Sequence, residues 1–437
     1  MNVRFKSQLA LLAVVCAGVP LLGQVAGQEP KDVAPPSPTQ AAAPAEKPGA
    51  VYREAMHPLD VVRSSLDNWS DAELQALSVG IHRAQAACLE AKPEDFSGDD
   101  LYDYAHLCSF GQLWPNADTA ALEYISSGAE TYRVQAYALR ITAQVHQNNA
   151  DDAVKTAEEM LRGLPYDAEV AYALHYLEDD LDQAWNPLAL RLEQEEHPQL
   201  LKALRAGTPL KALHSRAELS VGGLFDAGIR LALLLRYTGN EAAAELTAAE
   251  LRQAVAQAAG LPPGDQAVVA AASARYDLLD QRLRRFPVKR TLPIAGAVSP
   301  IRTSYGKAAV FVVFPDWCVQ CRRMMKTLNE FTTANAGLPI YAYGLMFNDQ
   351  PAGAQKAPAT HTAEDPRAGP TALVDPKLAT DWGATEFPYA VITNAAGVVQ
   401  FAGPVPADAF KGDGYIQRAI ERMYSLSVLK LQEGNLH

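Results

Sequence analysis

The spacing of apolar and polar positions changes along the chain, and each spacing predicts a different kind of element. From residue 51 to about residue 286, Ala, Leu, Glu and Arg recur every three or four positions, which is typical of amphipathic helices. Residues 309–314 form a continuous apolar run, as expected for a buried strand. After Pro388, two short apolar runs flank a turn that contains Gly397, which predicts a β-hairpin. The pattern therefore predicts an all-α domain followed by an α/β domain.

The clearest internal signal in the helical domain is a pair of helices. Residues 132–147 and 150–163 have helical spacing and are separated by two asparagines, and together they look like one tetratricopeptide repeat. A second pair, around residues 225–257 with a turn at Gly239, is similar but differs in length. Such repeats bury a continuous core only when several stack, so we expect an irregular α-solenoid of about five to seven helix pairs.

The helical domain is expected to span residues 51–288, with the α/β domain over residues 289–437. Its surface could bind a protein partner, or it could serve as a scaffold for the second domain, and the pattern leaves both open. Its histidines and tryptophans are interpreted as helix-face and core residues rather than as a site: His82, His106, His146, His175, Trp69, Trp114 and Trp185.

Candidate chemistry follows the apolar run, in the segment from Trp317 to Cys321. Cys318 and Cys321 are three residues apart at the start of a predicted helix, so they share one face and can form a disulfide. The unpaired N–H groups and the dipole of a helix N-terminus stabilise a thiolate. We therefore expect Cys318 to be the exposed sulfur, with a pKa below the usual value of about 8.5, and Trp317 to shield one side of it.

A CxxC sequence also occurs in structural disulfides and in zinc sites. Zinc needs four ligands, but the chain has no second CxxC, and His361 stands alone downstream. Copper binding through Met324 and Met325 is a weaker alternative, because methionines on an apolar helix face are more often core residues. We predict redox chemistry without a metal or a cofactor, and an inert disulfide is the main alternative.

Residues 292–424 resemble the thioredoxin fold, and within it the exported TlpA-like thioredoxins. The matching pieces are residues 314–321, residues 338–343, residues 372–375 and the hairpin that begins at Glu386-Phe387-Pro388. The resemblance implies that Cys318 and Cys321 are catalytic and that the peptide bond before Pro388 is cis. It also implies that the backbone at Pro388 pairs with an incoming peptide, with Trp317 and Phe387 beside it as substrate-binding residues.

The sequence departs from this family at two positions. Relatives place a buried Asp six residues before the first cysteine, or a Glu three residues after the second, whereas this chain has Val312 and Met324 there. Because such a carboxylate takes or relays the proton of the second cysteine, its absence should slow attack by Cys321 on a mixed disulfide. No histidine lies between the two cysteines to stabilise the thiolate.

The amino-terminal segment predicts export. Arg4 and Lys6 precede an apolar stretch over residues 9–22, which is shorter than the roughly 20 residues of a membrane span. We expect a signal peptide over residues 1–27, with an uncleaved membrane anchor as the alternative. A Pro/Ala-rich, disordered linker should follow over residues 28–50. The protein would then be periplasmic or secreted, without a stable membrane span after cleavage.

Charge and cysteine content agree with an exported protein that does not bind nucleic acid. The formal net charge is −12 at pH 7, which disfavours nucleic acid and anionic membranes as partners. Besides the CxxC pair, Cys88 and Cys108 should form a structural disulfide that contributes about 3 kcal/mol, and two buried free thiols are the alternative.

Together these patterns predict an exported thiol-disulfide oxidoreductase that exchanges disulfides with protein substrates and a separate redox partner. The alternative is a non-catalytic binding or assembly protein, in which the CxxC disulfide is structural and the helical domain carries the function. The apolar residues at positions 312 and 324 favour this alternative, whereas the Trp-Cys-x-x-Cys segment and the Phe-Pro hairpin oppose it.

Overall fold

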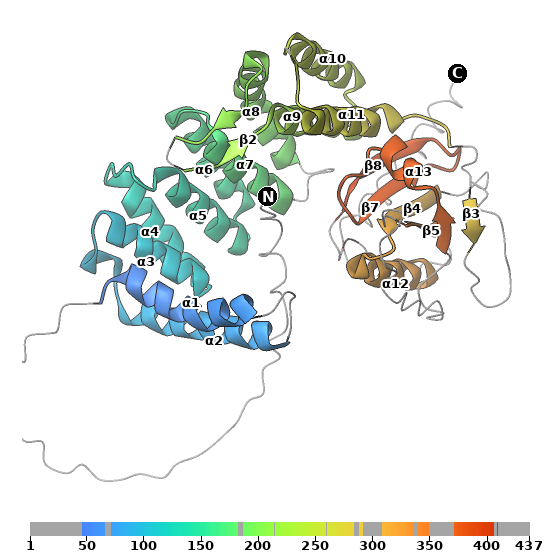
Figure 1. Ribbon diagram of the computed structural model, residues 1–437. Helices are drawn as coiled ribbons and strands as arrows, with labels where there is room; N and C mark the ends of the chain where they lie inside the picture. The colour runs from blue at the N-terminus through green and yellow to red at the C-terminus, as the bar shows by residue number, and fades with distance from the viewer. Residues whose placement is uncertain are drawn as a thin grey trace, which may run out of the picture. The chain divides into compact units, whose positions relative to one another are not determined.

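The computed structural model describes residues 46–65, 71–181, 187–213, 215–258, 260–283, 288–291, 308–334, 340–348, 371–405 and 409 (Figure 1). The predicted signal peptide and the linker up to residue 45 lie outside the described residues. Helix α1 begins at Pro48, so the last three residues of the predicted linker are helical. Residues from Glu46 onward belong to one compact unit.

The first part of this unit is helical. It contains α1 (Pro48–Ser65), α2 (Asp71–Glu90), η1 (Pro93–Asp95), α3 (Asp99–Phe110), α4 (Trp114–Ser126), α5 (Arg133–His146), α6 (Ala150–Gly163), α7 (Ala168–Asp180), α8 (Pro187–Ala206), α9 (Val221–Tyr237), α10 (Glu241–Gln257) and α11 (Pro263–Leu278). Two short antiparallel strands, β1 (Leu210–Lys211) and β2 (Glu218–Leu219), lie between α8 and α9. The two predicted helix pairs correspond closely to α5 with α6 and to α9 with α10.

The turns inside these pairs explain why their ends could be predicted. Asn148 and Gly239 each adopt a positive φ, of 61° and 85°, directly after the first helix of the pair. This left-handed conformation ends a helix and suits Gly and Asn. Asn240 then caps α10, because its side chain accepts a hydrogen bond from the N–H of Ala243.

The second part is a six-stranded mixed sheet with two described helices. Its elements are β3 (Val288–Thr291), β4 (Ala308–Pro315), α12 (Val319–Ala334), β5 (Ile340–Phe347), β6 (Thr371–Val374), α13 (Pro376–Asp381), β7 (Tyr389–Thr393) and β8 (Val399–Pro404). The strand order is β3-β6-β5-β4-β7-β8. Strand β4 runs parallel to β5 and antiparallel to β7, so the predicted apolar run is a central strand. The chain is therefore mostly helical, with a mixed α/β region at its C-terminal side.

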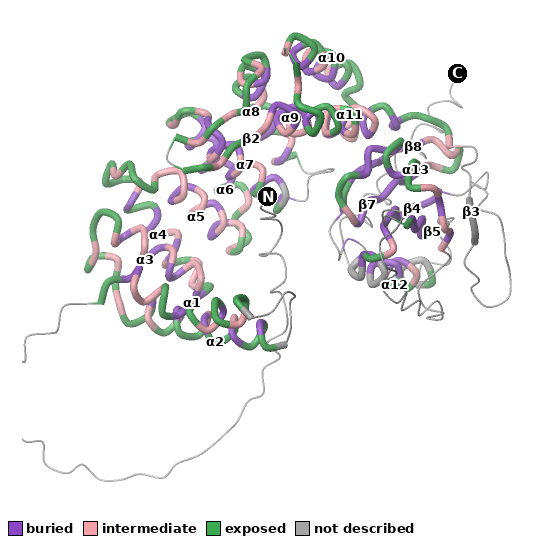
Figure 2. The backbone as a smooth tube through the Cα atoms, in the orientation of Figure 1, coloured by how far each residue is buried: buried purple, intermediate pink, exposed green. Residues whose placement is uncertain are grey.

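Strand β4 is buried along its whole length because both faces of the sheet are covered (Figure 2). Val310, Val312 and Phe314 lie in one apolar cluster with the two cysteines of the CxxC segment. The alternate residues Ala309, Phe311 and Val313 lie in a second cluster, which also contains residues of α8, α9, α10 and α11. The helical part and the sheet therefore share a core.

The helical part also covers the outer edge of the sheet. Strand β8 is an edge strand, and its Val399 carbonyl accepts a hydrogen bond of 3.0 Å from the N–H of Asp280. The N–H of Leu283 donates to the carbonyl of Gly397 at 2.9 Å. Residues 280–283, which precede the predicted boundary at 288/289, therefore already form hydrogen bonds with the sheet.

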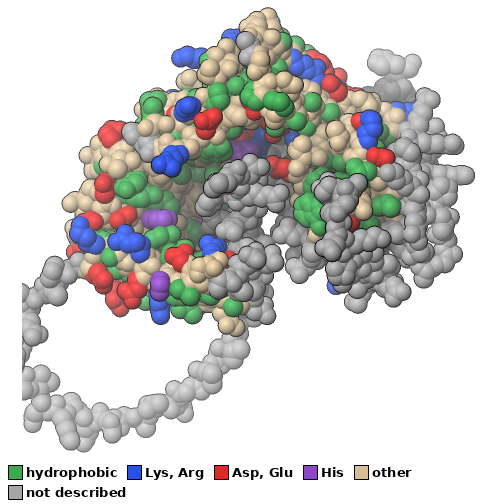
Figure 3. Space-filling view, viewed as in Figure 1, with side chains coloured by type: hydrophobic (Ala, Val, Ile, Leu, Met, Phe, Trp, Pro, Cys, Tyr) green, Lys and Arg blue, Asp and Glu red, His purple; other side chains and the backbone are tan. Residues whose placement is uncertain are grey.

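The described surface carries both signs of charge. On the face in Figure 3, acidic and basic side chains are interspersed over the helices. None of the described helices has the length and apolar character that a membrane crossing requires.

Candidate functional site

The CxxC segment lies where the central strand β4 meets helix α12. The chain turns after Pro315, whose carbonyl accepts a 3.0 Å hydrogen bond from the N–H of Cys318, and α12 begins at the next residue. Cys318 and Cys321 form a disulfide, with their Cα atoms 5.4 Å apart. The structure therefore places this disulfide at a helix N-terminus, at one end of a strand that is buried along its whole length.

The two sulfurs differ less in exposure than the sequence suggested. Cys321 is fully buried, and Cys318 is only 6% exposed, so the expectation of an exposed Cys318 sulfur is wrong. The apolar cluster that contains Val310, Val312 and Phe314 also encloses Cys318. The N–H of Cys321 donates to the sulfur of Cys318 at 3.2 Å. This amide belongs to the first turn of α12 and would also favour a Cys318 thiolate after reduction.

Pro388 lies at the same end of the sheet as the disulfide. Val313 of β4 pairs with Tyr389 of β7, so the antiparallel register puts Pro388 beside the end of β4. The peptide bond between Phe387 and Pro388 is cis, as the family resemblance implies. Pro388 itself is buried.

The main chain of Pro388 already has a hydrogen-bond partner next to the sheet. Its carbonyl already accepts a 3.0 Å hydrogen bond from the N–H of Val405, and proline has no N–H. Within the described part of the chain, the main-chain N–H and carbonyl of Phe387 have no hydrogen-bond partner. The groups that could pair with an extended peptide therefore belong to Phe387.

Aromatic side chains surround this segment. Trp317, which directly precedes Cys318, is 56% exposed, so much of its ring faces solvent. Phe387 is half-buried and packs against both core clusters, with its ring 5.4 Å from that of Phe347. The predicted substrate-binding residues Trp317, Phe387 and Pro388 thus come from the two chain segments that meet at the disulfide end of the sheet.

The positions that hold a carboxylate in the resembled family are apolar and buried here. Val312 and Met324 are both fully buried in the cluster that contains Cys321. Met325 lies in the same cluster and is also buried. These side chains pack against the cysteines but cannot accept a proton, so neither position supplies a base for Cys321.

The other cysteine pair lies in the helical part, away from the sheet. Cys88 of α2 and Cys108 of α3 form a disulfide, and both are fully buried. Next to them, the hydroxyl of Tyr104 donates to the carbonyls of Cys88 and Ala91 at 3.1 and 3.2 Å. The bridge links two consecutive helices within an apolar cluster.

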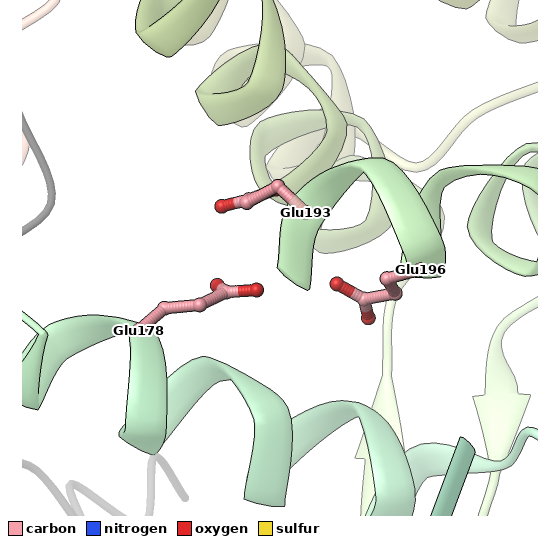
Figure 4. Close-up of side chains that lie close together, drawn as sticks. All are labelled: Glu178, Glu193 and Glu196. Atoms are coloured by element: carbon pink, nitrogen blue, oxygen red, sulfur yellow. The ribbon is translucent and has the colours of Figure 1, made fainter. Parts of the chain in front are cut away.

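One cluster of charged residues was missed by the sequence analysis. Glu178 of α7 and Glu193 and Glu196 of α8 point toward one another, and one carboxylate oxygen of each lies within 4.8 Å of the others (Figure 4). All three are buried. Arg230 of α9 lies 3.5 Å from both Glu178 and Glu193, and it contacts His175. A buried polar network therefore joins three helices.

Among the described residues, the network contains three glutamates, one arginine and His175. The hydroxyl of Tyr166 donates to Glu196 at 2.6 Å, which satisfies one oxygen without neutralising it. Burial and the neighbouring Glu178 carboxylate raise the pKa of Glu196 to about 8. Such glutamates are normally read from sequence as a solvated helix face, so only the three-dimensional packing of α7, α8 and α9 reveals them.

Comparisons with known proteins place the chain in no family. No family model and no curated protein matches it. Among solved structures, it is similar to the thioredoxin domain of a thiol-disulfide oxidoreductase from Bacteroides vulgatus, with 14% identity over 33% of this chain and 97% of that chain. The TM-score of this match is 0.25.

Proposed function

We propose that this protein is a thiol-disulfide oxidoreductase, in which a thioredoxin-like domain of the TlpA type exchanges disulfides with protein substrates. The observation that carries the proposal is the Cys318–Cys321 disulfide at the N-terminus of α12, with the segment Phe387-Pro388 at the same end of the sheet. The preceding helices would form a tetratricopeptide-like domain. Two disulfides suit an oxidising compartment, so export to the periplasm or the exterior belongs to the proposal.

The chemistry is a reversible two-step exchange. In the reduced protein, the Cys318 thiolate attacks one sulfur of a substrate disulfide, a mixed disulfide forms, and the other substrate sulfur leaves as a thiolate. The Cys321 thiolate then attacks the sulfur of Cys318 and releases the second substrate thiolate. The substrate gains two electrons and the protein is left with its Cys318–Cys321 disulfide. The same steps in reverse oxidise a substrate dithiol.

Proton transfer in the second step has no carboxylate at the usual positions. Cys321 has to lose its proton before it attacks, while Val312 and Met324 beside it are apolar. Solvent or the released substrate thiolate would have to accept the proton, because neither of these two positions holds a carboxylate. We therefore expect resolution of the mixed disulfide to be slow and the mixed disulfide to accumulate.

Substrate binding would use the main chain of Phe387 and the rings around it. An extended peptide can form hydrogen bonds with the N–H and carbonyl of Phe387, which aligns its sulfur with Cys318. The exposed ring of Trp317 offers apolar contact next to the reacting sulfur. A separate redox partner would restore the starting oxidation state, and no cofactor is needed for the exchange itself.

Single cysteine variants test the proposal. Cys318→Ser should abolish exchange, because no nucleophile remains at the substrate. Cys321→Ser should trap mixed disulfides, which non-reducing gel electrophoresis and mass spectrometry detect. A variant with both Cys88→Ser and Cys108→Ser is the matched control, since it removes the other disulfide and should still exchange. Equal residual activity in the two single variants would contradict the catalytic assignment.

A non-catalytic role is the second candidate, and two observations favour it. Cys318 is nearly buried, and apolar side chains occupy the positions of the usual carboxylates. The reduction potential of the pair separates the candidates. A potential above about −300 mV with fast exchange indicates an oxidoreductase, whereas a much lower potential with slow exchange indicates a structural disulfide.

A further inference from the structure

Tyr237, the last residue of α9, connects the helical part to the edge strand of the sheet. Its hydroxyl donates to the carbonyl of Ala402 in β8 at 3.2 Å and faces the N–H of the same residue at 3.5 Å. Its ring lies 5.5 Å from that of Phe401. Burial raises the pKa of Tyr237, so its phenol stays protonated and keeps its donor at physiological pH.

Ala402, which Tyr237 contacts, is close in sequence to the residue that forms a hydrogen bond with the Phe387-Pro388 segment. Ala402 is three residues before Val405, whose N–H donates to the carbonyl of Pro388. In between, β8 pairs with the start of β7, with Pro404 opposite Tyr389 and Gly403 opposite Ala390. Phe401 and Val405 also lie in the apolar cluster that contains both cysteines, and Tyr237 packs against that cluster.

Through these contacts, helix α9 is connected to the Phe387-Pro388 segment. The hydroxyl of Tyr237 fixes β8 at Ala402, and β8 fixes Pro388 through Val405. The position of Pro388 in turn fixes the main chain of Phe387, to which it is covalently joined. No step of this path passes through the sulfur atoms, so Tyr237 can affect peptide alignment without changing the disulfide itself.

We infer that Tyr237 is a positioning residue, through which the helical part sets the alignment of peptide substrates at Phe387. The inference rests on the proposed function, since it concerns the same exchange reaction. It gives the helical part a defined role in the chemistry, besides any partner that its surface binds. Disulfides without a peptide backbone should not depend on Tyr237, because they need only the sulfur of Cys318.

The test compares Tyr237→Phe with a matched control. Tyr237→Phe keeps the ring against Phe401 and removes only the hydroxyl. Tyr276→Phe removes a hydroxyl from the same helical part, where it donates to the carboxylate of Glu245 at 3.1 Å. Reduced wild-type, variant and control proteins are each reacted with a cysteine-containing peptide disulfide and with bis(2-hydroxyethyl) disulfide. Thiol release is measured under single-turnover conditions.

We expect Tyr237→Phe to react about fivefold more slowly with the peptide disulfide at limiting concentration, as the loss of one buried hydrogen bond allows. The half-saturating peptide concentration should rise by a similar factor. The rate with bis(2-hydroxyethyl) disulfide and the reduction potential should stay unchanged, and Tyr276→Phe should match the wild type in every measurement.

Other outcomes overturn the inference. If Tyr237→Phe slows both disulfides equally, fails to fold or reacts like the wild type with the peptide, Tyr237 has no positioning role. In each of these cases the wild type still exchanges, so the proposed function stands. If the wild-type protein reacts with neither disulfide, the proposed function fails and the inference fails with it.

Discussion

At the residue scale, Cys318 and Cys321 lie in the same apolar cluster, but the sulfur of Cys318 accepts a hydrogen bond from a backbone N–H group. The N–H of Cys321 donates to the sulfur of Cys318, whereas Cys321 is enclosed by apolar side chains such as Val312 and Met324. After reduction, a thiolate is therefore favoured at Cys318 and disfavoured at Cys321. In the proposed exchange reaction, this asymmetry favours Cys318 as the attacking thiolate and Cys321 as the resolving one, although both are buried in the oxidised protein.

Glu196 is the residue whose protonation state should govern stability in the helical part. It lies beside Glu178 of α7 and Glu193 of its own helix, accepts a hydrogen bond from the hydroxyl of Tyr166, and feels the charge of Arg230 on α9. With a pKa of about 8, it keeps its proton at neutral pH in the folded protein. In the unfolded chain it loses that proton near its ordinary value of about 4.3.

We predict that the free energy of unfolding falls as pH rises from about 4.5 to 8, because the folded state binds more protons than the unfolded state in that range. The stabilising contribution of Glu196 is complete below its unfolded pKa and is lost as pH passes its folded pKa. Glu196→Gln, which stays neutral, should flatten this dependence. Urea denaturation at a series of pH values measures it.

The neighbouring residue Glu195 provides the control, since Glu195→Gln makes the same substitution at an exposed position of the same helix. It should leave the pH dependence as in the wild type. An unchanged slope in Glu196→Gln would show that another group of the network, such as Glu178, holds the proton.

At the element scale, helix α11 packs directly against the turn that follows α13. Gly383 ends α13 with a φ of +68°, and a Cβ atom there would lie 2.2 Å from the carbonyl oxygen of Ala271 in α11. The same atom would lie 2.8 Å from the N atom of Arg275. Gly383 is therefore required both for the left-handed turn and for the close approach of the two backbones.

We predict that Gly383→Ala lowers the free energy of unfolding by more than about 2 kcal/mol, since it combines an unfavourable φ with a clash against backbone atoms. Gly260→Ala separates the two effects, because Gly260 has a φ of +66° and no atom within 4 Å of the added Cβ. It should cost only about 1 kcal/mol. Thermal or urea unfolding of both variants gives the comparison, and equal losses would mean that the contact with α11 can relax.

The elements differ in how far the sequence could predict them. The pairs α5–α6 and α9–α10 were predictable because a local signal, Asn148 or Gly239 in a left-handed turn, separates two runs of helical spacing. The apolar run of β4 and the adjacent CxxC were equally visible. The role of α11 was not, because periodicity shows that a helix has an apolar face but does not identify what covers it.

The candidate site shows the same limit. Cys318, Cys321 and Pro388 were found from a motif and a family resemblance, both of which depend on residues close in sequence. The burial of Cys318, the hydrogen bond from Val405 to Pro388 and the contact of Tyr237 with Ala402 all depend on β8 and α9. These pairings join residues far apart in the chain, and single-sequence patterns do not encode them.

At the scale of the whole molecule, the helical part and the sheet share one apolar core. The sequence suggested that an α/β domain begins at residue 289. In the structure, Phe311 and Val313 of β4 pack in one cluster with Tyr276 and Leu278 of α11. The edge of β8 is covered by residues 280–283 and by Tyr237. Among the described elements, both the second face and the outer edge of the sheet depend on the helical part.

A fragment of residues 289–437 should therefore fail to form a stable α/β domain. It would expose the apolar face around Phe311 and leave the N–H and carbonyl groups of β8 unpaired at an open edge, which favours aggregation. A fragment of residues 220–437 keeps α9, α10 and α11 and should unfold cooperatively with an intact Cys318–Cys321 disulfide. Circular dichroism melts and size-exclusion chromatography compare the two. If the shorter fragment were monomeric and as stable as the longer one, α11 would only rest on the sheet, and Tyr237 could not determine where β8 lies.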